Sequence, residues 1–88
     1  MYRVVTYPEA SDQIAELPPH LLPDYARALD ALVAAPWSGA SHNANNPDAE
    51  VRRWLFGPLG VGQVLYLVLE REREVHVLRV VWLELPDD

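Results

Sequence analysis

The chain has 88 residues, of which 50% are hydrophobic, and a formal net charge of −6 at pH 7. That length suits one compact domain with one core, so we expect a single domain over residues 1–88. Cysteine is absent, which excludes a disulfide framework, a thiolate zinc site and a cysteine nucleophile. All 7 basic side chains are arginines. Phosphate binding would therefore depend on a few local arginines acting against the acidic charge of the whole chain.

The N-terminal residues do not have the pattern of a targeting signal. Residues 1–5 alternate as a strand does and lack the basic and then apolar organisation of a signal peptide. No apolar run approaches the roughly 20 residues that a membrane-spanning helix requires. We therefore expect a soluble cytoplasmic protein with no membrane partner.

The N-terminal half predicts one strand and two helices. Residues 2–6 alternate around β-branched side chains, and Thr6 and Glu9 have the spacing of a capping box, which predicts a helix start. An apolar helical face follows until a Pro-Pro pair stops it. A second apolar helical pattern lies between His20 and Pro36, with a proline tolerated in its first turn.

The C-terminal half predicts three strands after a polar loop. Residues 36–48 are rich in Ser, Gly, Ala, Asn and His, which is typical of a surface loop. Strands are expected at residues 51–56, 64–70 and 74–85. The middle one is apolar on both faces, which favours a central position in the sheet.

The order β-α-α-β-β-β predicts an α+β fold. A helical hairpin would cover one face of a mostly antiparallel, twisted four-stranded sheet, and function is expected on the face left open. In the last strand, simple alternation puts Arg79 on the same face as Val75, Val77 and Val81. A charge among valines would need an acidic partner, so a structural ion pair is the main alternative to a functional role for Arg79.

Several short strings, taken in order, span most of the chain. They are residues 15–19 (AELPP), 28–32 (ALDAL), 51–53 (VRR), 64–66 (VLY) and 75–80 (VHVLRV). Their order and spacing resemble the RelE/ParE superfamily of small bacterial toxins, which are paired with antitoxins. In the RelE-like branch the resemblance implies a ribosome-dependent endoribonuclease that cuts messenger RNA. In the ParE-like branch it implies a poison of DNA gyrase.

The resemblance implies a cognate antitoxin as partner and, for an active enzyme, the ribosome with its messenger RNA. The candidate catalytic residues are Arg52, Arg53, Arg79 and His76, and the candidate RNA-binding residues are Arg52, Arg53, Gln63 and Trp82. The arginines would bind phosphate, and His76 or His42 would shuttle protons near neutral pH. Trp82 would stack on bases or, alternatively, pack in the core. The histidines lack nearby carboxylates at ligand spacing, so no metal and no cofactor is expected.

The chain also departs from the family pattern. Gln63 takes a place where the family commonly has Arg, and Gln cannot neutralise the charge that develops in phosphoryl transfer. Residues 81–88 lack the basic residues and the Tyr or His that usually follow the last strand. Two alternatives therefore stand beside the endoribonuclease. One is a catalytically degenerate binding protein that holds an antitoxin-like segment or a second copy of itself, and the other is a gyrase inhibitor.

Overall fold

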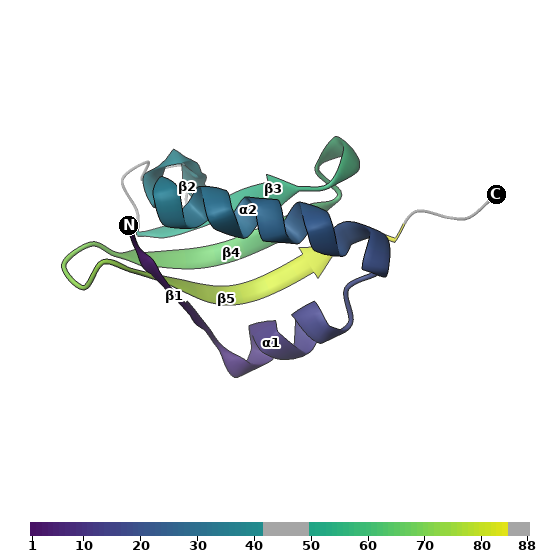
Figure 1. Ribbon diagram of the computed structural model, residues 1–88, viewed down its shortest axis with the longest axis horizontal. Helices are drawn as coiled ribbons and strands as arrows, with labels where there is room; N and C mark the ends of the chain where they lie inside the picture. Colours follow the sequence, from purple (N-terminus) through teal and green to yellow (C-terminus); the bar gives the residue numbers. More distant parts are fainter. Residues whose placement is uncertain (42–49, 85–88) are drawn as a thin grey trace.

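The protein forms one helical layer against one sheet, as seen in a computed structural model that describes residues 1–41 and 50–84 (Figure 1). The strands are β1 (Arg3–Thr6), β2 (Ala40–Ser41), β3 (Val51–Phe56), β4 (Gly62–Leu69) and β5 (Glu74–Trp82). The helices are α1 (Pro8–Ala15) and α2 (Leu22–Ala34), with short 3-10 turns η1 (Pro19–Leu21), η2 (Pro36–Ser38) and η3 (Pro58–Gly60). The predicted α+β class is confirmed.

The sheet has the strand order β1-β5-β4-β3-β2. Its pairs are antiparallel except for β1, which runs parallel to β5. The mostly antiparallel sheet and the central place of β4 are confirmed, but the expected count of four strands is wrong. Ala40 and Ser41, expected in a loop, pair with Arg53 and Arg52 as a short fifth strand, because η2 returns the chain to the edge of β3.

Both helices contribute to one core on one side of the sheet. In Figure 1, α2 crosses the face of the sheet, whereas α1 lies beside β5 beyond the end of β1. The buried side chains are Ala10, Leu17, Leu21, Tyr25, Ala28, Leu32, Phe56, Val64, Tyr66, Val68, Val75, Val77 and Val80. Gln13 of α1 also accepts a hydrogen bond from the backbone N–H of Val80 at 2.6 Å, so the helix covers the edge of β5 as well. No helix in the described part of the chain has the length and apolar character needed to cross a membrane.

A β-bulge in β5 changes which residues share a face. Tyr66 lies opposite Val77, and Leu65 lies opposite Arg79, so Leu78 is the extra residue between them. Val80 is consequently buried, whereas Arg79 and Val81 are exposed. The expected alternation, with Arg79 on the face of Val77, is therefore wrong from Leu78 onward. The bulge moves Arg79 to the face that the helices leave open.

The start of α1 is where the sequence placed it, but the predicted capping box is not formed. The N-cap residue is Tyr7, with Pro8 in the first turn and no side-chain hydrogen bond at the cap. Thr6 is still part of β1, in register with Val77, so its backbone is held by the sheet. The parallel pairing of β1 with β5 thus determines where the helix begins.

Candidate functional site on the open face

The register of three neighbouring strands arranges the open face in rows. One row contains Arg53, Leu65 and Arg79, and the next contains Leu55, Gln63 and Val81. Because neighbouring strands lie about 4.8 Å apart, the two arginines stand on either side of Leu65 with roughly 10 Å between their Cα atoms. Gln63 lies one row away. These two rows thus carry two cations and one amide among apolar side chains.

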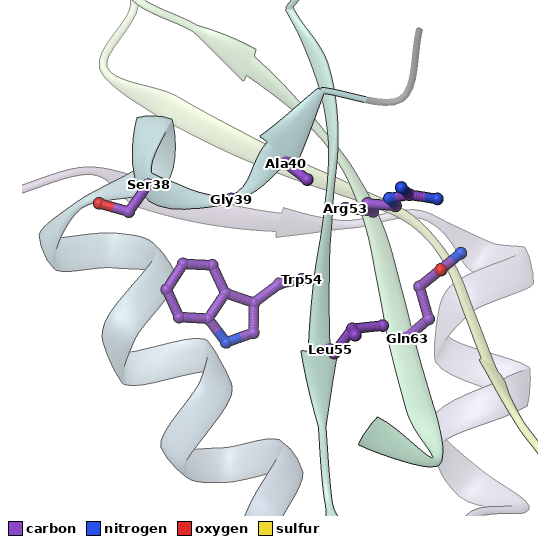
Figure 2. A pocket seen from close by; sticks show the side chains of 7 residues that line it. All are labelled: Ser38, Gly39, Ala40, Arg53, Trp54, Leu55 and Gln63. Atoms are coloured by element: carbon purple, nitrogen blue, oxygen red, sulfur yellow. The ribbon is translucent and has the colours of Figure 1, made fainter. Parts of the chain in front are cut away.

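A pocket of about 450 Å³ lies at the β2–β3 edge of this face. Its lining residues are Ser38, Gly39, Ala40, Arg53, Trp54, Leu55 and Gln63. In Figure 2 the side chains of Arg53 and Gln63 extend to the same side of the sheet, whereas the indole of Trp54 extends to the other. Arg53 and Gln63 are therefore the polar side chains that β3 and β4 contribute to the pocket. The expectation that one of the two adjacent arginines lies on the open face is met by Arg53.

Arg52 lies on the opposite, helix-covered face and is only 8% exposed. Its Nε and Nη2 atoms donate hydrogen bonds to the carbonyl oxygen of Gly39 at 2.9 and 2.6 Å. The guanidinium also lies over the ring of Trp37, 5.3 Å from the centroid. The sequence hypothesis that Arg52 contacts RNA is therefore not supported by its position. In this structure Arg52 connects η2 and β2 to the sheet.

Arg79 is on the open face and has the acidic partner that the sequence led us to expect. Its Nη2 atom lies 3.3 Å from Oε1 of Glu9, at the start of α1. The two side chains are 54% and 58% exposed, so water screens the pair, and its contribution to stability is small. A phosphate group could replace Glu9 at little cost.

His76 is on the open face, but both of its ring nitrogens are engaged. Nδ1 lies 2.9 Å from the hydroxyl oxygen of Tyr7, and Nε2 lies 3.0 Å from Oε1 of Glu74. Arg3 also donates to Glu74. The hydrogen bond from His76, assisted by Arg3, holds the pKa of Glu74 below its ordinary value. The other histidine considered as a proton shuttle, His42, lies outside the described residues.

Trp82 is not beside the two arginines. It lies on the helix-covered face with Val80, opposite Gly62, and packs partly buried against the core. Within residues 1–41 and 50–84, no group of three or more His, Asp or Glu side chains could hold a metal ion. The sequence does not predict Tyr7 and Glu74, the partners of His76, as site residues. Their contact with His76 depends on the parallel pairing of β1 with β5, which no local pattern indicates.

One end of the open face is apolar. Leu55, Val81 and Leu83 are 58%, 41% and 72% exposed, respectively. With Gln63, Trp82 and the turn before β4, they line a second pocket of about 210 Å³. Large exposed aliphatic side chains gathered in one place are typical of a surface that binds another protein segment.

Three solved structures show the same architecture. A chain of the intact RelBE toxin–antitoxin complex from E. coli has a TM-score of 0.77 at 14% sequence identity, over 96% of this chain and 99% of that one. The isolated RelE toxin of E. coli gives 0.77 at 12% identity, over 99% and 89%. A chain of the RelBE2 toxin–antitoxin complex from Mycobacterium tuberculosis gives 0.73 at 22% identity, over 92% and 96%. No family model and no curated protein sequence matches the chain.

These likenesses define the class of fold. They confirm the RelE-like toxin fold that the sequence resemblance to the RelE/ParE superfamily implied, over nearly the whole chain. At identities of 12–22% the likeness concerns the backbone. The chemistry depends on the side chains that this chain places on the fold.

Proposed function

We propose that the protein is the toxin component of a bacterial type II toxin–antitoxin pair and acts as a ribosome-dependent endoribonuclease on messenger RNA. The row formed by Arg53, Leu65 and Arg79, on the open face of a RelE-like fold, is the observation that carries the proposal. Two guanidinium groups on one face can hold the backbone of one RNA strand, and Gln63 can donate a further hydrogen bond. The site is well suited to an extended single strand.

The acidic charge of the chain is consistent with a messenger RNA target that the ribosome already holds. A protein with a net charge of −6 binds free RNA weakly, because the overall field opposes the local arginines. In the ribosome, the messenger RNA is held by other contacts. The toxin then needs only local phosphate contacts, and its cognate antitoxin would block the open face.

The test is primer extension on a reporter messenger RNA in a purified translation system, with and without ribosomes. We expect cuts at A-site codons only when ribosomes are present. Arg53→Ala and Arg79→Ala should each lower the rate of cutting about tenfold or more, because each removes a phosphate contact. Arg27→Ala is the matched control, since Arg27 is exposed on α2 and pairs with Asp24. Cutting that is equal in all variants would reject the phosphate role of the row.

A catalytically degenerate binding protein is the second candidate, and the exposed apolar end around Leu55, Val81 and Leu83 favours it. That surface fits an apolar antitoxin segment or a second copy of the chain. This candidate predicts no growth arrest on expression and no cuts at high protein excess. Inhibition of gyrase supercoiling without RNA cleavage would instead support the gyrase-directed alternative.

A further inference from the structure

A chain of hydrogen bonds runs along the open face where β1 meets β5. The Tyr7 hydroxyl contacts Nδ1 of His76 at 2.9 Å, and Nε2 of His76 contacts Oε1 of Glu74 at 3.0 Å. Arg3 donates to the other carboxylate oxygen of Glu74. A hydroxyl, an imidazole and a carboxylate in this order form the arrangement by which enzymes transfer a proton from a hydroxyl group.

The chemistry of the partners determines where the protons lie. Arg3 and His76 keep the Glu74 carboxylate ionised, and an ionised carboxylate can only accept hydrogen bonds. Nε2 of a neutral His76 must therefore carry the ring proton. Nδ1 is then an acceptor, so the Tyr7 hydroxyl donates to it. The lone pairs of the Tyr7 oxygen can accept a proton from a molecule bound on the open face.

The burial of the three side chains fits this direction of transfer. The His76 and Glu74 side chains are 15% and 17% exposed, whereas Tyr7 is 37% exposed. The imidazole and the carboxylate are thus largely shielded from water, and Tyr7 is the most exposed residue of the three. A partly buried carboxylate behind an imidazole stabilises the imidazolium form.

The chain of hydrogen bonds lies close to the proposed phosphate site. The backbone N–H of Tyr7 donates to the carbonyl of Val77 at 3.0 Å, so Tyr7 lies beside the segment of β5 that carries Arg79. Glu9, two residues beyond Tyr7, reaches Arg79. A phosphate that displaces Glu9 from Arg79 would bring the neighbouring ribose towards the Tyr7 hydroxyl.

We propose that Tyr7 is a catalytic residue of this protein, the group that takes the proton from the attacking 2′-hydroxyl of RNA, and that His76 and Glu74 are positioning residues behind it. This inference rests on the proposed endoribonuclease function. It assigns the proton transfer to the β1–α1 junction, where Tyr7 lies.

The reaction balances without a further reactant. The ribose 2′-oxygen attacks the adjacent phosphorus, its proton passes to the Tyr7 oxygen, and the Tyr7 proton passes to Nδ1 of His76. The bond from phosphorus to the 5′-oxygen breaks, and the 5′-oxygen takes a proton from water. The products are a 2′,3′-cyclic phosphate and a 5′-hydroxyl, and the His76 imidazolium then returns its proton to the hydroxide.

The experiment compares Tyr7→Phe with Tyr25→Phe in the ribosome-dependent cleavage assay. Tyr25 is a buried core residue. Tyr25→Phe is therefore the matched control, because it also removes one phenol oxygen but does so in the core and not on the open face. We expect Tyr7→Phe to lower the cleavage rate about 100-fold, the scale of general base catalysis, and Tyr25→Phe to cut as the wild type does. Mapping of the 3′ ends should show cyclic phosphates.

A pH profile distinguishes a proton-transfer role from a structural one. The groups that face His76 are Tyr7, Glu74 and Arg3, with Arg79 and Glu9 further along the same face. Because a general base accepts a proton only in its deprotonated form, the wild-type rate should rise with pH. His76→Gln should remove that rise, and this variant decides the matter if Tyr7→Phe does not fold.

The outcomes separate the two proposals. Suppose that the wild type cleaves, and that Tyr7→Phe cleaves within threefold of its rate or His76→Gln keeps the wild-type pH profile. Either result would overturn the role of Tyr7 and leave the endoribonuclease in place. Absence of cleavage by the wild type would overturn the endoribonuclease and the catalytic role of Tyr7 together. Cleavage by the wild type that is lost in Tyr7→Phe and kept in Tyr25→Phe would support both.

Discussion

Arg52 and Arg53 are adjacent in the chain, chemically identical, and placed in opposite environments. Arg52 is on the helix-covered face, where its guanidinium meets the Gly39 carbonyl and the ring of Trp37. Arg53 is exposed on the open face beside a pocket. The comparison teaches that a pair of basic residues in a strand is not a basic patch, because the sheet separates the two side chains.

The side chains in the two environments have different roles. The covered region around Arg52 joins η2 and β2 to the sheet through buried polar contacts, and the Tyr66 hydroxyl donates to the Pro36 carbonyl at 2.6 Å in the same region. The open face leaves Arg53 exposed to solvent. Substitutions in the first region should therefore change stability, and substitutions in the second should change binding.

The largest expected effect comes from the two arginines themselves. Arg52→Ala should lower the free energy of unfolding by about 2–4 kcal/mol, because the Gly39 carbonyl loses the guanidinium that satisfies it in a buried place. Arg53→Ala should stay within about 0.5 kcal/mol of the wild type. Urea denaturation of the two variants measures the difference. Equal losses would contradict the structural role of Arg52.

Gly39→Ala should cost about 1–3 kcal/mol in the same region through overpacking. A Cβ atom on Gly39 would lie 2.0 Å from the Tyr66 hydroxyl oxygen and 2.7 Å from the Arg53 carbonyl oxygen. The backbone of Gly39 is extended, at φ −71°, so the cost would be steric. Denaturant titration against Ala40→Gly, on the neighbouring exposed residue, checks the effect. A neutral Gly39→Ala would mean that η2 can move away from the sheet.

Two buried tyrosines provide a finer comparison. Tyr66→Phe removes the hydrogen bond to the Pro36 carbonyl and should lower the free energy of unfolding by about 1–2 kcal/mol. The Tyr25 hydroxyl is buried without a hydrogen-bond partner among the described residues, so Tyr25→Phe should be neutral or stabilising. Thermal melts of both variants under one set of conditions test the pair, and the reverse order would refute the interpretation.

The smallest expected effect concerns pH. Hydrogen bonds from Tyr2 and Trp37 hold the pKa of Glu70 below its ordinary value of 4.5. The folded state therefore binds fewer protons than the unfolded state, and the stabilisation is present above that value and lost as the pH falls through the folded pKa. Glu70→Gln should flatten the loss of stability in acid, measured by melts from pH 6 to pH 3. Glu72→Gln, an exposed neighbour in the same turn, is the control.

Local patterns were sufficient for much of the fold. The apolar run of β4 marked a central strand, and the prolines and apolar spacing located α1 and α2. Alternation also predicted that one of Arg52 and Arg53 reaches the open face. It could not say which, because that choice depends on the side of the sheet that the helices cover.

The sequence by itself determined the acidic balance of the chain and the order of every element except β2, because these follow from composition and hydrophobic periodicity. The RelE-like class of fold was indicated by the resemblance of several short strings to the RelE/ParE superfamily. Only the tertiary structure decided the surface chemistry. The bulge at Leu78 exposes Arg79, and the parallel pairing of β1 with β5 brings Tyr7 to His76 across 69 positions in the sequence. Both depend on the register of strands distant in sequence, which packing against the helices selects and which no local pattern encodes.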